Sequence, residues 1–124
     1  MPSAAERRWL VWEELGDVTL VRFLVQNIKN EPDILGIFES LTRLVEVQGC
    51  QKLLLNCGNL KYVASYAIGK LLQLNQKIQA AGGQLALCCP TPVVQEILAI
   101  MKLKLNVYPT EREALDKLSP DRLG

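Results

Sequence analysis

Three consecutive leucines, Leu53 to Leu55, occupy the middle of an apolar run over residues 52–57. A strand with one face in water alternates apolar and polar side chains, whereas a run without alternation is typical of a strand covered on both faces. Residues 84–89 form a second short run of the same kind. Strands of this type occur where helices pack on both sides of a sheet, so the two runs favour an α/β fold.

Segments with helical spacing separate these strands. Apolar residues recur at intervals of three and four positions in four stretches of the chain, which predicts four helices. Glycine or proline marks several of their limits, and two threonines stand where a helix is capped. The expected helices run from Pro32 to Gly49, from Ser65 to Gly82, from the cap Thr91 and Pro92 onward, and from the capping box Thr110-x-x-Glu113 to about Leu118.

The amino-terminal part of the chain predicts a β-hairpin. Residues 9–15 and 18–26 are rich in β-branched and apolar side chains, and the pair Gly16-Asp17 between them suits a tight turn. Residues 27–30 form a polar connection, and residues 105–108 a last short strand. Strands separated by helices imply parallel pairing with right-handed crossovers. We therefore expect an α/β fold with a mixed, mostly parallel sheet, an N-terminal β-hairpin and about four helices.

The length of the chain limits its organisation to one domain. A chain of 124 residues is long enough for one hydrophobic core and too short for two. We expect the domain to span residues 9–118, between a polar N-terminal tail of residues 1–8 and a C-terminal tail of residues 119–124.

At the start of this domain, Trp9 and Trp12 have opposite parity, so a regular strand would place them on opposite faces.

The charge balance makes several functions improbable. Lys and Arg together number 14 against 13 Asp and Glu, which gives a net charge of +1. A nucleic-acid-binding face must neutralise several phosphates, so nucleic acid is not an expected partner.

No apolar run approaches the roughly 20 residues that span a bilayer, and the apolar stretch after residue 8 is too short for a signal peptide. We therefore expect a cytoplasmic protein with no membrane insertion.

The residue types on which many enzymes depend are missing or badly spaced. The chain has no histidine, which removes the commonest general base and a frequent metal ligand. Its four cysteines, Cys50, Cys57, Cys88 and Cys89, lack the paired C-x-x-C spacing of zinc and redox sites. Cys88 and Cys89 would point to opposite faces of a strand, which prevents them from sharing a metal. We expect reduced thiols, no metal, no cofactor, no catalytic residue and hence no enzyme.

The segment YVASYAIGKLL, from Tyr62 to Leu72, has one hydroxymethyl group at the junction between a loop and a helix. A serine at a helix N-cap accepts hydrogen bonds from free N–H groups of the first turn, a contribution of about 1 kcal/mol. On that interpretation Ser65 only starts the helix. Alternatively, an exposed hydroxyl at this place is accessible to a kinase, and a phosphate there adds about −1.5 to −2 charge at pH 7. The residues alone leave both interpretations open.

Several segments between Lys52 and Leu115 are informative in combination. They are residues 53–57, residues 59–63, Ala64-Ser65, the helix start Ile68-Gly69-Lys70-Leu71-Leu72, residues 80–87, Pro92-Val93-Val94 and residues 108–115. In their order and spacing they resemble a STAS domain, the family of sulfate transporters and anti-sigma factor antagonists, and in particular its stand-alone bacterial antagonists. The resemblance covers about half of the chain and fits the fold expected above.

In that family the corresponding helix opens with Asp-Ser-Ser or Asp-Ser-Thr followed by Gly-Leu-Gly, and the first hydroxyl accepts a phosphate. The resemblance places Ser65 at the phosphoacceptor, Ala64 where the Asp usually stands, and Tyr66 at the second hydroxyl. Ala67 takes the place of the first Gly, and Ile68-Gly69 matches Leu-Gly. The acceptor is therefore kept, while three of its neighbours differ.

The resemblance implies a regulatory, protein-binding role. Such a module would bind an anti-sigma factor that is also a serine kinase of the GHKL type, free the sigma factor, and be reset by a phosphatase. The alternative is a STAS scaffold without phosphorylation, or a soluble subunit of a larger assembly such as a lipid-transport ATPase complex. The partner-binding residues that we expect are Lys61, Tyr62, Ala64, Ser65, Tyr66, Gly69, Lys70 and Gln73. Neither the individual partner nor the oligomeric state follows from the sequence.

Overall fold

The computed structural model describes residues 8–100 and 105–120, and its centre is a five-stranded sheet. The strands lie in the order β1-β2-β4-β6-β7. β1 and β2 pair antiparallel, and the other neighbours are parallel, as predicted. The strands of this sheet are β1 (Leu10–Leu15), β2 (Val18–Phe23), β4 (Lys52–Asn56), β6 (Gln84–Cys88) and β7 (Asn106–Tyr108).

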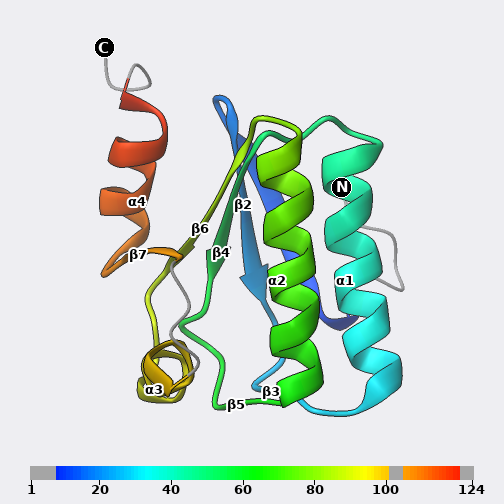
Figure 1. Ribbon diagram of the computed structural model, residues 1–124. Coiled ribbons are helices and arrows are strands. Elements are labelled where there is room, and N and C mark those ends of the chain that lie inside the picture. The colour runs from blue at the N-terminus through cyan, green and yellow to red at the C-terminus, as the bar shows by residue number, and fades with distance from the viewer. Residues whose placement is uncertain (1–7, 101–104, 121–124) are drawn as a thin grey trace.

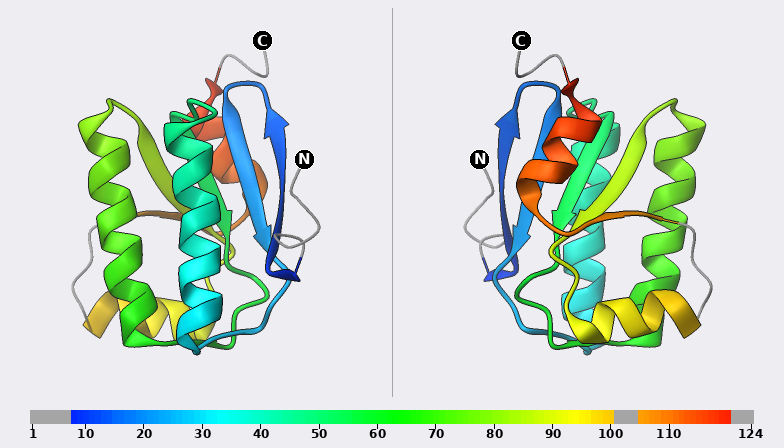
Figure 2. Two further views of the ribbon diagram at one scale, coloured as in Figure 1. Left: turned by 90° about the vertical axis from the view of Figure 1, so that its right-hand side faces the viewer. Right: turned by 90° about the vertical axis from the view of Figure 1, so that its left-hand side faces the viewer.

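The helices of the described residues cover both faces of this sheet (Figure 1). α1 and α2 lie side by side on one face, and α4 lies on the opposite face (Figure 2). α3 lies at the end of the sheet toward which the parallel strands point. The helices are α1 (Glu31–Glu46), α2 (Ser65–Ala80), α3 (Pro92–Ile100) and α4 (Glu111–Leu118), which confirms the four that the periodicity predicts.

A second, two-stranded sheet joins β3 (Asn27–Ile28) to β5 (Tyr62–Val63) in parallel. The prediction of a strand through residue 26 and a polar connection over residues 27–30 is therefore wrong in detail. β2 ends at Phe23, where its ladder with β1 ends, and Ile28 is buried with 3% of its surface exposed. This pairing joins segments that are distant in sequence, so no local pattern indicates it.

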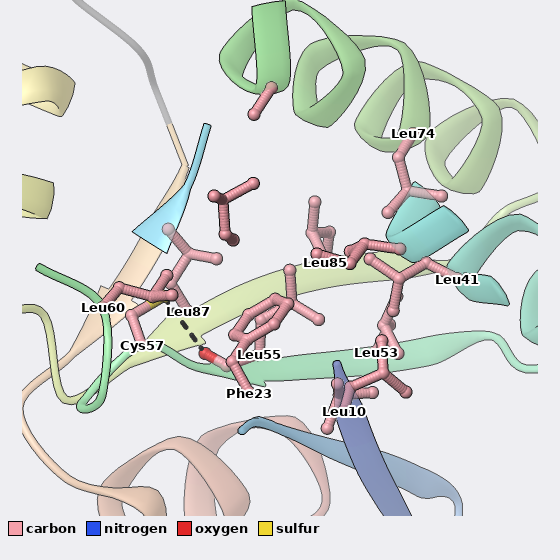
Figure 3. Packing of buried hydrophobic residues seen from close by; sticks show 14 of the residues in the cluster. Leu10, Phe23, Leu41, Leu53, Leu55, Cys57, Leu60, Leu74, Leu85 and Leu87 are labelled. Atoms are coloured by element: carbon pink, nitrogen blue, oxygen red, sulfur yellow. Dashed lines mark hydrogen bonds between the residues drawn. The ribbon is translucent and has the colours of Figure 1, made fainter. Parts of the chain in front are cut away.

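The three leucines of β4 divide between two hydrophobic clusters. Leu53 and Leu55 belong to the larger cluster, between the sheet and the α1–α2 layer, and Leu54 belongs to the smaller one under α4. Figure 3 shows Leu53 and Leu55 within the larger cluster, together with Leu41 of α1. All three leucines are at most 2% exposed. The absence of alternation in this run thus has the predicted cause, which is burial on both faces.

Side-chain caps at two helix starts agree with the prediction. The Thr91 hydroxyl accepts a hydrogen bond from the Val94 N–H at 3.4 Å, and the Thr110 hydroxyl accepts one from the Glu113 N–H at 3.1 Å. Each satisfies an N–H group that has no partner within its own helix. Local sequence therefore determines where α3 and α4 begin.

The two tryptophans do not lie on opposite sides of the sheet, contrary to the expectation from parity. Both pack against the larger hydrophobic cluster. β1 begins at Leu10, so the alternation of the strand does not extend to Trp9. The Trp9 Nε1–H instead donates to Asp33 Oδ1 at 3.1 Å, and its ring lies against Gly36 of α1. A contact with a helix, rather than strand geometry, thus positions Trp9.

Candidate functional site

The β3–β5 pair fixes the start of α2, where the candidate phosphoacceptor lies. The Ala64 N–H donates to the Ile28 carbonyl at 2.8 Å, which ends the extended segment. The Ala64 carbonyl then accepts from the N–H groups of Ala67 and Ile68 at 3.0 and 3.2 Å, which are the first bonds of the helix. Ala67 and Ile68 are 1% and 6% exposed, so the first turn is held against the core.

Ser65 is the first residue of α2 and not its N-cap. Ala64 is the N-cap, with an extended backbone (φ −71°, ψ 153°) and no side-chain hydrogen bond to the helix. The prediction that Ser65 caps the helix is therefore wrong by one position, because the β3–β5 pairing sets the last extended residue. Capping does not account for a serine at this place.

The Ser65 side chain lies on the surface. The residue is exposed, and within residues 8–100 and 105–120 its hydroxyl has no hydrogen-bond partner. An unpartnered hydroxyl on the first turn of a helix is accessible to another macromolecule. It is also close to the N–H groups that give a helix N-terminus its affinity for anions.

Two half-exposed tyrosines lie within three residues of Ser65 in the chain. Tyr62 of β5 is 50% exposed and Tyr66 of α2 is 48% exposed. The Lys70 Nζ lies 5.6 Å from the centroid of the Tyr66 ring, which is within the range of a cation–π contact. Exposed tyrosines and a half-buried lysine at one helix start form an amphipathic surface of the kind that protein partners recognise.

The structure brings the expected partner-binding residues to adjoining positions. Tyr66, Gly69, Lys70 and Gln73 follow the three- and four-residue spacing of one helix face, next to Ser65. Of the eight, Ala64 and Lys70 are half-buried and the others are exposed. We call these eight residues the Ser65 surface: Lys61, Tyr62, Ala64, Ser65, Tyr66, Gly69, Lys70 and Gln73. Their role in partner binding stays a prediction.

The cysteines are free thiols with restricted exposure. Cys57 and Cys88 are 4% and 0% exposed, and burial raises the pKa of both thiols, that of Cys57 to about 12. Cys89 packs against the same cluster as Cys88, so the two do not point to opposite faces as expected. β6 ends at Cys88, and the left-handed backbone of Cys89 (φ 55°) breaks the alternation. No group of three potential metal ligands occurs among the described residues.

Residues 33–114 match the family model of the STAS domain. Because this match covers more than half of the 124 residues, the chain belongs to the STAS domain family. The family and the α/β fold that the sequence segments indicate are therefore both confirmed.

Among the described residues, no helix is both long and apolar enough to cross a bilayer.

Three solved structures illustrate the shared fold. A proposed anti-sigma factor antagonist from Thermotoga maritima has a TM-score of 0.80 at 19% identity, over 94% of this chain and 98% of that one. An anti-sigma-factor antagonist (STAS) domain protein from Planctomyces limnophilus has a TM-score of 0.74 at 25% identity, over 89% and 97%. The Bacillus cell fate determinant SpoIIAA in its phosphorylated form has a TM-score of 0.70 at 20% identity, over 87% and 97%. No curated protein sequence matches the chain significantly.

Proposed function

We propose that this chain is a non-enzymatic regulatory module that binds an anti-sigma factor through the Ser65 surface. The partner would be an anti-sigma factor that is also a serine kinase, and the complex would form in the cytoplasm. Two solved structures of this class, a proposed anti-sigma factor antagonist and an anti-sigma-factor antagonist (STAS) domain protein, match 94% and 89% of this chain. This structural similarity supports the class of function. A similar structure exists for SpoIIAA in a phosphorylated form, which is consistent with control by phosphorylation.

The observation that carries the proposal is the exposed Ser65 hydroxyl with no partner in the described part of the chain. A phosphate on it adds about −1.5 to −2 charge at pH 7, which a helix N-terminus tolerates, so the fold survives modification. A partner packed over Tyr62 and Tyr66 would have to desolvate or repel that charge. An uncompensated buried charge of this kind costs about 3–4 kcal/mol, which weakens binding roughly 100- to 1,000-fold. Phosphorylation would thus release the partner, and a phosphatase would restore binding.

Phosphorylation can be tested with anti-sigma kinases encoded in the same genome. Each kinase is incubated with ATP and the intact chain, and the mass of the product is measured. We expect the mass increase of one phosphate, mapped to Ser65 by peptide analysis and absent from Ser65→Ala. Ser40 is a natural internal control because it is 3% exposed and its hydroxyl donates to the Gly36 carbonyl at 3.0 Å. A phosphate on any residue other than Ser65, or on none, contradicts the switch.

Partner release is a separate measurement. Binding of the same kinases to wild type, Ser65→Ala and Ser65→Asp is measured by calorimetry. We expect Ser65→Ala to bind like wild type and Ser65→Asp to bind much more weakly. Equal affinities for Ser65→Asp and wild type would remove the proposed mechanism even if phosphorylation occurs.

A second function is favoured by two substitutions at the same site. Ala64 offers no carboxylate beside the acceptor, and Tyr66 replaces the second hydroxyl that the family usually has. A constitutive scaffold, or a soluble subunit of a larger assembly such as a lipid-transport ATPase complex, would need neither group. Kinase and phosphatase genes beside this gene would favour the switch, whereas transporter genes would favour the subunit. Stable co-purification with transporter components would settle the choice for the second function.

A further inference from the structure

The layer formed by α1 and α2 has a groove on its surface. Only Lys70 and Gln73 of its lining belong to the Ser65 surface. The groove has a volume of about 550 Å³ and lies between the two helices. Its apolar lining comes from Leu35, Phe38, Val47 and Leu74. Leu35 is 41% exposed and Val47 is 76% exposed. Both of these exposed apolar side chains line the groove.

The two walls of the groove carry opposite charges. On the α1 wall, Glu39 and Glu46 are seven residues apart, and on the α2 wall, Lys70 and Lys77 are also seven residues apart. Seven residues are about two helical turns, so each pair lies along one helix face. α2 contains no acidic residue. The walls are therefore an acidic stripe and a basic stripe with the same spacing.

One ion pair fixes the relative height of the stripes. Lys77 Nζ lies 2.9 Å from Glu46 Oε1, so these two residues are level with each other across the groove. α1 and α2 run in the same direction (Figure 1), and Glu39 and Lys70 are therefore level as well, two turns earlier. Within the described residues no carboxylate pairs with Lys70, which lies over the Tyr66 ring.

A surface that fits this groove must place a cation over Glu39 and Glu46, and an anion over Lys70 and Lys77. A second copy of the chain meets this requirement. A two-fold axis parallel to the helices and midway between them places α2 of the copy over α1, and α1 of the copy over α2, at the same height. Every acidic position then faces a basic one. Arg43, which lies 3.6 Å from Glu39 in the same helix, falls level with the uncharged Leu74 and meets no like charge.

We propose that the α1–α2 layer is a self-association surface, on which two copies of this chain pair through the acidic and basic stripes. A 16-residue helix is about 24 Å long, and two neighbouring helices are about 20 Å wide. This footprint buries about 1,000 Å² over both copies, which is the lower limit for a specific interface. Exposed ion pairs contribute little affinity each, so the dimer is weak and sensitive to salt.

Self-association of this kind has a consequence for the Ser65 surface. Lys70 and Gln73 line the groove and also belong to that surface. A dimer therefore covers two positions that a regulatory partner would contact, so dimerisation and partner binding compete. The dimer itself requires neither the partner nor phosphorylation, and its test is independent of the proposed function.

Charge reversal provides the test. One variant reverses the basic stripe (Lys70→Glu with Lys77→Glu), and another reverses the acidic stripe (Glu39→Lys with Glu46→Lys). A control, Arg112→Glu with Lys117→Glu, makes the same change in net charge as the basic-stripe variant, at exposed positions of α4. Circular dichroism checks that each chain is folded. Sedimentation velocity then gives the mass of each chain between about 10 µM and about 1 mM, the range of weak affinities.

Wild type and the control should approach the dimer mass as protein concentration rises. Both should return toward the monomer mass when NaCl is raised from about 0.05 M to about 0.5 M, because salt screens the ion pairs. Each stripe variant alone should remain a monomer, because like charges then face each other. An equimolar mixture of the two variants should regain the dimer, because each then presents the charge that the other lacks. A monomeric wild type, a stripe variant that dimerises alone, or a mixture that stays monomeric would each overturn the proposal.

Discussion

Lys52 Nζ lies 2.7 Å from Asp17 Oδ2 and also donates a hydrogen bond to the Leu118 carbonyl at 2.6 Å. Asp17 belongs to the turn between β1 and β2, and Leu118 is the last residue of α4. One ammonium group thus joins the hairpin turn to the carboxyl end of α4, on the face of the sheet opposite α1 and α2. A cation at this end of a helix also interacts favourably with its dipole.

This contact predicts a pH-dependent contribution to stability. The pKa of Asp17 is lowered from its ordinary value, chiefly by the hydrogen bond from Lys52 and then by that from Ser119. Because the folded-state pKa is lower than the unfolded one, Asp17 stabilises the fold above the unfolded pKa, and this stabilisation is lost as pH falls through the folded pKa. We expect Asp17→Asn to lower the free energy of unfolding at about pH 6, by an amount that shrinks below about pH 4.

Urea unfolding at several pH values measures this effect. In a Lys52→Met background the substitution Asp17→Asn should change the free energy of unfolding much less, because the principal partner is gone. A difference between wild type and Asp17→Asn that stays constant from neutral to acidic pH would show that the carboxylate is not the stabilising group.

The start of α2 lacks a side-chain cap, and this predicts a stabilising substitution. Ala64 has the extended backbone of an N-cap but no acceptor for the free N–H groups of the first turn. Ala64→Ser supplies one, and we expect it to raise the free energy of unfolding by about 1 kcal/mol. Ala80→Ser, at the other end of the helix, is the matched control and should lower it by a few tenths. Equal effects from the two substitutions would mean that Ala64 is not the N-cap.

Two helical glycines predict opposite responses to the same substitution. A methyl group on Gly36 would overlap the Trp9 ring, lying 2.7 Å from Cζ3, whereas one on Gly69 would meet nothing within 4 Å. We expect Gly36→Ala to lower stability by about 1–3 kcal/mol and to change tryptophan fluorescence. Gly69→Ala should raise stability by about 0.5–1 kcal/mol, through helix propensity alone, and leave fluorescence unchanged. A stabilising Gly36→Ala would contradict the packing of Trp9 on α1.

Burial predicts the reactivity of the cysteines. The pKa of Cys57 is raised to about 12 by desolvation, so almost no thiolate forms at neutral pH. We expect iodoacetamide to label Cys50 and Cys89, which are half-buried, before Cys57 and Cys88. Peptide mass analysis gives the order of labelling, and labelling in urea should remove it. Rapid labelling of Cys57 in the native chain would contradict its burial.

Local sequence signals predicted much of the fold. The non-alternating run Leu53 to Leu55 indicated a strand covered on both faces, and its residues do divide between two clusters. Gly16 has the positive φ of 65° that a tight turn requires, and Thr91 and Thr110 cap their helices. These features depend on neighbours within a few residues. The proposed limits of the domain and its two tails stay a prediction.

The candidate site was found in the sequence through one serine and a family resemblance, and its surface was only partly foreseen. The exposure of Tyr62 and Tyr66 does not follow from helical spacing. Trp9 and Cys89 also lie where strand alternation does not place them, because each falls just outside a strand. Such positions depend on contacts between segments that are remote in the chain.

The sequence by itself determined the order of strands and helices and the sides on which the central strand is covered, because periodicity and turn residues act over short distances. Only the tertiary structure decided that the Ser65 hydroxyl is exposed and that Ala64, one residue earlier, caps the helix. The physical reason is the hydrogen bond from the Ala64 N–H to the Ile28 carbonyl, which ends the extended segment at that residue. Packing on one face of the sheet also sets α1 beside α2, and this places the acidic stripe of one helix next to the basic stripe of the other.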